Sequence, residues 1–180
     1  LFRSQDAIDI IDSYTPDIIL LDLMMPHVNG WDVIDYVRKK YNLLIGERTA
    51  EDIKMQIGSA IKLDLPLSMT IKGRDQINGL LTTIEFTSEE MRDAIKDSLK
   101  VILDAVKLVL ELMPPDLAGD VVENGIVLTG GGALLKGLDK YISEAVKLPV
   151  FVADEPLLAV VRGTSVVLEE LDLLQQISYE

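Results

Sequence analysis

Three short stretches of this sequence carry residues whose types and spacing could support chemistry. Asp22 follows the apolar run Ile18 to Leu21, so its carboxylate is predicted at the carboxyl end of a strand, where ligands collect in open α/β sheets. Gly130 to Gly132 follow a second apolar run, and glycines let the backbone approach a ligand closely. Glu51 and Lys54 are spaced i, i+3, so they share one face of a predicted helix.

Asp22 has no second carboxylate at the same end of its predicted strand. Phosphoryl transfer to a carboxylate needs a cation such as Mg²⁺, which prefers near-octahedral oxygen ligands. The nearest strand carboxylate, Asp17, lies at the other end of the run, about 16 Å away at about 3.3 Å per residue. A loop aspartate without phosphotransfer activity is therefore favoured. His27 is interpreted as a solvated side chain, and no metal site is predicted.

The glycine loop differs from the two common phosphate-binding motifs. It is not the dinucleotide fingerprint, because Leu135 stands where a third glycine is needed, and it is not a P-loop, because Leu138 follows Gly137 where Lys-Ser/Thr is needed. A nucleotide site of another kind is left open. Glu51 and Lys54 have a simpler alternative as a solvated ion pair, which contributes only about 0.2–0.5 kcal/mol.

Composition limits the classes of partner. The chain has 180 residues, 48% of them apolar, which is enough for one good core or two small ones. Its net charge of −13 makes nucleic acid an unfavourable partner. The absence of cysteine fits a reducing cytoplasm, and the longest apolar runs are far too short to span a membrane.

The N-terminal pattern predicts a helix, a buried parallel strand and a second helix. Ser4 is a plausible cap for the first helix, and the strand runs from Ile18 to Asp22. The second helix is expected from Trp31, with Asn29 as its cap. Its inner face is predicted to carry Val33, Ile34, Val37 and Tyr41.

The middle of the chain predicts a helix, a hairpin and a long helix. Thr49 is predicted to cap the helix that carries Glu51 and Lys54, and Asn78-Gly79 is the turn of a β-hairpin. Thr87 and Glu90 form a capping box that starts another helix. The segment from 98 to 113 has one narrow polar stripe, so a mostly buried helix is expected there. The buried hairpin side is predicted to carry Met69, Ile71, Ile84 and Phe86.

The C-terminal third predicts two parallel strands and their helices. The strands are expected at 126–129 and 150–153, with Asp154 at the end of the second. Pro156 is predicted at the first position of the last helix, and Gly163 inside that helix indicates close packing on a neighbour.

Two resemblances join these observations. "PDIILLDLMMPHVNGWDVIDYVRKK" resembles the central part of a response-regulator receiver domain. That resemblance implies that Asp22 is the phosphoacceptor. The family's chemistry also needs an acidic pair that helps to hold Mg²⁺, a Thr or Ser after the fourth strand and a Lys after the fifth, and this sequence has no counterpart of them. "YNLLIGERTAEDIKMQIGSA", "GIVLTGGGALLKGLDKYISE" and "ADEPLLAVVRGT" resemble the C-terminal half of MreB, the bacterial actin of rod-shape determination, over about residues 34–175.

The MreB resemblance implies a cytoplasmic ATP-binding filament protein of the actin/Hsp70 superfamily. It implies that Glu51 and Lys54 contact adenosine. It also implies that the loop of Gly130, Gly131 and Gly132 lies beside the adenine and the α-phosphate. The family's two phosphate loops and its water-positioning acid have no counterpart in this sequence. ATP or ADP binding is therefore expected to be weak or lost, Mg²⁺ is not expected, and hydrolysis is not expected.

We interpret the chain as a chimera joined within the helix "DVIDYVRKK". The predicted fold class is α/β, a parallel sheet with flanking helices and an inserted small α+β lobe. Residues 1–40 are the receiver-like unit and 41–180 an MreB-like domain II, with a IIB-like lobe at 47–97 and a IIA-like part at 98–180.

Three functions stay open at this point. They are an MreB-like nucleotide-binding and cytoskeletal module, a signalling phosphoacceptor, and a folding chimera without activity. Self-association is expected, because the loss of domain I should expose apolar surface. The membrane contact of the parent family is expected to be lost.

Overall fold

The computed structural model describes residues 30–169. The N-terminal half of this range forms a small lobe around a three-stranded antiparallel sheet with the order β1-β2-β3. Its helices and strands are α2 Trp31–Tyr41, β1 Leu43–Leu44, α3 Glu47–Ile57, β2 Ser68–Asp75 and β3 Leu81–Thr87. The hairpin predicted at Asn78-Gly79 is confirmed: β2 and β3 pair from Ser68↔Thr87 to Arg74↔Leu81, and Gly79 has a positive φ of 74°.

The lobe is closed by helices that bury one face of the sheet. α2 buries Val33, Ile34 and Val37, as its periodicity predicts. On the hairpin, Ile71 and Phe86 are fully buried while Met69 and Ile84 are half-buried, so the predicted inner side is confirmed. Its other face is exposed. The predicted cap Asn29 lies outside the described residues, and Gly30 occupies the N-cap position of α2.

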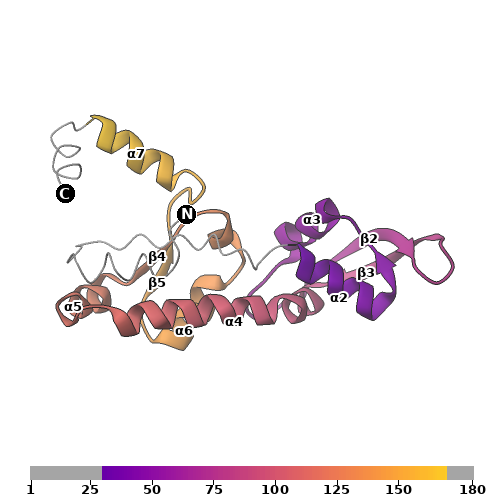
Figure 1. Ribbon diagram of the computed structural model, residues 1–180, viewed down its shortest axis with the longest axis horizontal. Coiled ribbons are helices and arrows are strands. Elements are labelled where there is room, and N and C mark those ends of the chain that lie inside the picture. The colour runs from indigo at the N-terminus through magenta and orange to yellow at the C-terminus, as the bar shows by residue number, and fades with distance from the viewer. Residues whose placement is uncertain (1–29, 170–180) are drawn as a thin grey trace.

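A single long helix leads from this lobe to the rest of the described chain. α4 Ser88–Leu112 begins at the predicted capping box, in which the Thr87 side chain accepts from the Glu90 N–H and the Glu90 carboxylate accepts from the Thr87 N–H. The two helices expected from the sequence are thus one helix, and the predicted boundary between residues 97 and 98 lies inside it. Figure 1 shows α4 running along the molecule between its two sheets.

The second unit is built on two parallel strands. α5 Pro115–Asn124, β4 Ile126–Leu128, η1 Gly131–Leu134, α6 Leu138–Val146 and β5 Val150–Val152 follow α4 in the chain, and α7 Ala159–Glu169 comes last. β4 and β5 pair in parallel register from Ile126↔Val150 to Leu128↔Val152. The predicted third strand at 18–22 lies outside the described residues. α4 and α6 pack beside β4 and β5, and α7 projects away from them (Figure 1).

Several sequence expectations are wrong in detail. α3 begins at Glu47 with Gly46 as its N-cap, so Thr49 lies inside the helix and does not cap it. Pro156 lies in a turn, because α7 begins only at Ala159. Among the described residues Gly163 has no close neighbour, since a Cβ added there would meet nothing within 4 Å. α5 was not predicted.

α4 is also less buried than its composition predicts. Its inner face packs against α2, α3, β3 and α6, and its buried residues include Met91, Ile95, Leu99, Ile102 and Val106. Val101, Leu108 and Leu112 are exposed. Composition reports how apolar a helix is, whereas burial depends on how many neighbours surround it. Among the described residues no helix is long and apolar enough to span a membrane.

Candidate functional site

The glycine loop leaves β4 through a backbone conformation that favours glycine. Gly130 has a φ of 77°, and its N–H donates to the Pro156 carbonyl over 2.9 Å, which holds the loop beside the segment after β5. The chain then forms the short helix η1, in which the Ala133 N–H donates to the Gly130 carbonyl over 3.3 Å. The N–H groups of Gly131 and Gly132 precede that first internal bond, as the first N–H groups of any helix do.

Within residues 30–169 the glycines of this loop have open space in front of their backbone. A Cβ added at Gly130 or Gly132 would meet nothing within 4 Å, and at Gly131 only Leu157 Cδ2 lies near, at 3.6 Å. Gly131 and Gly132 are exposed. Backbone N–H groups without a side chain in front of them are suited to an anion or a flat heterocycle.

Glu51 and Lys54 are paired with each other on α3. Lys54 Nζ lies 2.6 Å from Glu51 Oε2, and about a quarter of the Lys54 side chain is exposed. Glu51 also lies over the start of α2, since a Cβ added at Gly30 would be 3.3 Å from its Oε1. The i, i+3 ion pair predicted from the sequence is therefore present. Within residues 30–169 neither side chain makes a hydrogen bond or ion pair to Gly130, Gly131 or Gly132.

A backbone contact ties the end of α3 to the end of the glycine loop. Ser59 forms an isolated parallel bridge with Lys136, and the Ala60 N–H donates to the Lys136 carbonyl over 2.8 Å. Lys136 Nζ in turn donates to the Gln56 carbonyl over 2.6 Å. α3 and η1 therefore meet at this junction although 77 residues separate Ser59 from Lys136. Sequence reasoning missed the junction, because nothing in either stretch specifies the other.

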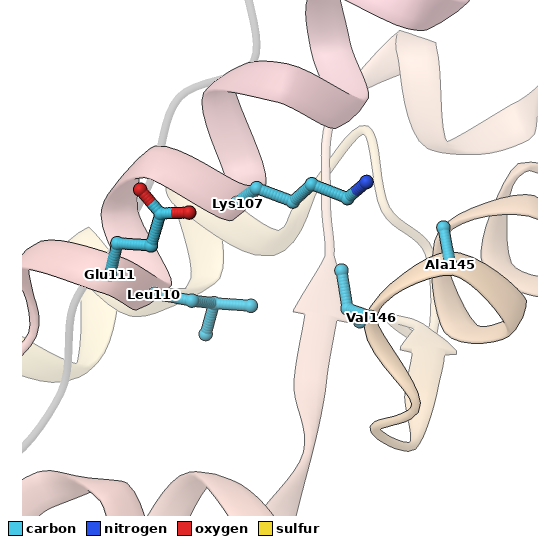
Figure 2. Close-up of a pocket in the computed structure, with 5 residues that line it drawn as sticks. All are labelled: Lys107, Leu110, Glu111, Ala145 and Val146. Atoms are coloured by element: carbon cyan, nitrogen blue, oxygen red, sulfur yellow. The ribbon is translucent and has the colours of Figure 1, made fainter.

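A shallow groove of about 240 Å³ lies elsewhere, between α4 and α6. Figure 2 shows the side chains that line it, which are Lys107, Leu110, Glu111, Ala145 and Val146. None of the residues predicted for the site is among them. A groove with two opposite charges and three small or aliphatic side chains has no set of converging polar groups to orient a small ligand.

A charged cluster joins α2 to the start of α4. The Glu90 carboxylate accepts hydrogen bonds from Lys40 Nζ over 2.6 Å, from the Tyr41 hydroxyl and from the Thr87 N–H. Burial alone would raise the pKa of Glu90, but the hydrogen bonds from Lys40, Tyr41 and Thr87 outweigh it and lower that pKa from 4.5 to about 2. The hydrogen bond to Glu90 raises the pKa of Lys40 and that of Tyr41. The cluster is structural, since it fixes the corner between the two helices.

This cluster predicts a defined pH dependence. Because the pKa of Glu90 is depressed in the folded state, its contribution to stability is present above pH 4.5 and is lost as the pH falls from 4.5 towards 2. Glu90→Ala should lower the free energy of unfolding by about 1–2 kcal/mol at neutral pH, through loss of the capping box and of the hydrogen bonds to the carboxylate. The ion pair between Lys40 and Glu90 adds little to the free energy of unfolding, because the Lys40 side chain is about half exposed to solvent.

Glu90→Gln is the matched control, because an amide can still complete a capping box. Urea unfolding of wild type and Glu90→Gln over a pH series isolates the charge. The stability difference between them should shrink as the pH falls below 4.5. A difference that stays constant down to about pH 3 would show that the Glu90 charge does not act as described.

Two other predicted features cannot be located. Asp22 and His27 lie outside the described residues, so the phosphoacceptor hypothesis stays a prediction. Across residues 30–169, no three His, Cys, Asp or Glu side chains come together as a set of metal ligands.

The arrangement of these elements matches that of solved bacterial proteins. The chain is similar to MreB5 of Spiroplasma citri bound to ADP, with a TM-score of 0.77 and 38% identity over 84% of this chain and 45% of that one. MreB5 bound to AMPPNP matches equally well, with a TM-score of 0.77 and 39% identity. Structures of MamK share the fold at 18% identity and a TM-score of 0.59. The described residues are thus a fragment of an actin-like α/β fold.

Sequence comparison identifies the family. The model of the MreB/Mbl protein family matches residues 29–176. The cell shape-determining protein Mbl of Bacillus cereus is 44% identical over 143 residues, 79% of this chain and 43% of that protein. The cell shape-determining protein MreB of Escherichia coli K12 is 44% identical over 78% of this chain and 41% of that protein. The chain belongs to the MreB/Mbl family and spans less than half the length of these relatives.

The comparisons bear on the predicted junction within "DVIDYVRKK". The family match begins at residue 29, so all of α2 lies within the segment that matches the MreB/Mbl family. They give no support to the receiver-domain chimera.

Proposed function

We propose that this chain is the nucleoside-facing part of an MreB/Mbl-type cytoskeletal protein acting in cell shape. In this proposal residues 41–180 are its second domain, with a IIB-like lobe at 47–97 and a IIA-like part at 98–180. Adenine nucleotide binds between α3 and the glycine loop. The observation that carries the proposal is the open backbone at Gly130 and Gly132, where a Cβ would meet nothing within 4 Å, in a fold that matches an ADP-bound MreB.

The side chains of the site have separate roles in this proposal. The Glu51 carboxylate accepts hydrogen bonds from the nucleoside, and Lys54, paired with it at 2.6 Å, fixes its orientation and donates in turn. Gly130, Gly131 and Gly132 let the backbone lie against the adenine and α-phosphate. The Ser59–Lys136 junction supports the geometry by keeping the end of α3 beside the end of the loop.

Binding should be weak and insensitive to the phosphates. Charge-assisted hydrogen bonds to phosphate are the strong contacts of a nucleotide site, about 1.5–3 kcal/mol each, and this sequence has no counterpart of the family's two phosphate loops. The net charge of −13 also opposes a polyanion. We propose that the chain binds adenosine, ADP and ATP alike and does not hydrolyse ATP, and that it acts in the cytoplasm.

A single added methyl group should separate binding from folding. Gly132→Ala places a Cβ in open space, so the free energy of unfolding should change by less than about 0.5 kcal/mol, while ADP affinity falls at least about tenfold because the methyl group occupies the ligand's approach. Equilibrium titration of both proteins with ADP, read by fluorescence or thermal shift, measures the change.

Gly119→Ala in α5 is the control, because its Cβ also meets nothing within 4 Å and lies on another element. It should leave ADP affinity unchanged. Equal affinities for wild type and Gly132→Ala would exclude the glycine loop as the nucleotide site. Loss of ADP affinity in Glu51→Ala, but not in Glu47→Ala one turn earlier on α3, would support Glu51 as a contact of the nucleoside.

A further inference from the structure

The chain contains three Asn-Gly pairs, at 29–30, 78–79 and 124–125. Asparagine followed by glycine is the sequence at which an asparagine side chain most readily loses its amide group, because glycine has no Cβ to hinder the approach of its backbone nitrogen. Asn29 lies outside the described residues. The other two pairs lie on different elements, one in the turn between β2 and β3 and the other at the end of α5.

Loss of the amide requires only the two residues and water. The backbone nitrogen of the glycine gives up its proton to water or hydroxide and forms a bond to Cγ of the asparagine. The bond from Cγ to the side-chain nitrogen breaks, and that nitrogen takes up a proton and leaves as ammonia. Water then opens the cyclic imide at either of its carbonyls. The product is aspartate, or isoaspartate, in which the main chain runs through the side-chain carbons.

The pair Asn78-Gly79 is open to solvent. All residues from 76 to 80 are exposed. Among the described residues, nothing lies within 4 Å of a Cβ added at Gly79. Figure 1 shows the turn between β2 and β3 at the free end of the hairpin. Water and hydroxide therefore reach the pair, and the fold can protect it only through bonds within the turn.

Asp75 binds the groups that the reaction uses. Its backbone carbonyl accepts from the Gly79 N–H over 2.9 Å, and its Oδ2 accepts from Asn78 Nδ2 over 2.8 Å. On the other side, Asn78 Oδ1 accepts from the Leu80 N–H over 2.9 Å. A carboxylate only accepts and a backbone N–H only donates, so these partners fix the orientation of the Asn78 amide. The attacking nitrogen and the leaving nitrogen are thus both held by one residue.

We propose that Asn78-Gly79 is a self-modification site, at which Asn78 loses its side-chain amide, and that Asp75 sets the rate by holding the turn closed. Asp75 is a positioning residue, since it takes no part in the bonds that form and break. Ring closure requires local opening of the turn, which releases the Gly79 N–H and the Asn78 amide from Asp75. The proposal is independent of the nucleotide site, because none of these residues belongs to it.

The modification changes the turn that joins β2 to β3. A carboxylate at position 78 replaces the amide donor beside the Asp75 carboxylate, and two like charges at that separation repel each other. Isoaspartate lengthens the main chain before Gly79, which displaces its N–H from the Asp75 carbonyl. Asp75 also pairs with Leu43 of β1, so the change loosens the sheet at that end.

Mass spectrometry measures the rate at each pair separately. The folded chain is incubated at mildly alkaline pH in water enriched in heavy oxygen, which marks only the products formed during the incubation. Trypsin then places the two described pairs in different peptides, 75–92 and 108–136, and fragment ions locate the labelled residue. Asn78 should react at least about tenfold more slowly in the folded chain than in the chain unfolded in urea, because local opening limits the reaction.

Asp75→Asn tests the role of the carboxylate. The oxygen of the new amide can still accept from the Ile77 N–H, as Asp75 Oδ1 does over 2.7 Å, but the amide has no second acceptor for Asn78. The rate at Asn78 in the folded chain should rise at least about fivefold. Gln76→Ala, at an exposed position of the same turn, is the control and should leave the rate unchanged.

The second pair reports unfolding of the whole chain. Asn124 ends α5, and the Gly125 N–H donates to the Val121 carbonyl over 2.9 Å. The rate at Asn124 should be the same in wild type and in both variants. Three outcomes would overturn the proposal: no label at position 78 in the urea-unfolded chain, equal rates at position 78 in folded wild type and Asp75→Asn, or a rise at position 124 that matches the rise at 78.

Discussion

Phe86→Ala is expected to lower the free energy of unfolding by about 3–5 kcal/mol, the range for removing a buried aromatic ring. Phe86 is fully buried on β3, at the centre of the lobe that holds α3. Its ring packs edge-on against Tyr36 and Tyr41, with centroids 6.0 and 6.5 Å away. The cavity would therefore open between the hairpin and α2, and the flanking rings cannot close it without leaving the positions that place Tyr41 at Glu90.

Urea unfolding followed by circular dichroism measures this effect. Leu81→Ala on the same strand is the matched control, because Leu81 is 87% exposed and its loss should cost less than about 0.5 kcal/mol. A loss below about 1 kcal/mol for Phe86→Ala would mean that the lobe does not depend on this core.

Gly58→Ala is expected to destabilise the chain by about 1–3 kcal/mol and to weaken nucleotide binding at the same time. A Cβ at Gly58 would lie 2.2 Å from the Lys54 carbonyl oxygen, which accepts the Gly58 N–H, and 3.0 Å from Leu135 Cδ1. The backbone must shift at the point where α3 ends, because a carbonyl oxygen cannot move aside as a flexible side chain can. That shift separates Ser59 from Lys136, and with them α3 from the glycine loop.

Gly58→Ala should lower both the free energy of unfolding and the affinity for nucleotide, whereas the other substitutions should lower only one of the two. Denaturant unfolding and ADP titration of the same protein measure both effects, and Gly119→Ala serves again as a glycine with open space around it. Destabilisation with unchanged ADP affinity would show that the junction supports the fold without positioning the site.

The features that could be predicted from sequence are the local ones. The hairpin follows from Asn78-Gly79 between two alternating runs, and the start of α4 follows from Thr87 and Glu90, three residues apart. The positive φ of Gly130 likewise fits a glycine-rich turn after a strand. In each case a few neighbouring residues determine the backbone, so the pattern is sufficient.

The features that could not be predicted depend on distant residues. α5 has only ten residues, which is shorter than the window over which helical periodicity is read, and only Pro115 at its first turn signalled it. The exposure of Leu108 was not predicted, because a helix with a single narrow polar stripe is expected to be buried by other elements on all its remaining sides. The Ser59–Lys136 junction joins two stretches with no common motif, so the support of the site was not visible from the sequence.

We propose that this chain binds the nucleoside through α3 and the glycine loop without strong phosphate contacts. Isothermal titration calorimetry with adenosine, ADP and ATP in turn, on wild type and on Gly132→Ala, tests it most directly. The three ligands should bind wild type weakly and within about threefold of one another, or under about 1 kcal/mol, and all three should be lost together in Gly132→Ala. Micromolar ATP binding with no detectable binding of adenosine would contradict the claim, because the affinity would then come from groups that hold the phosphates.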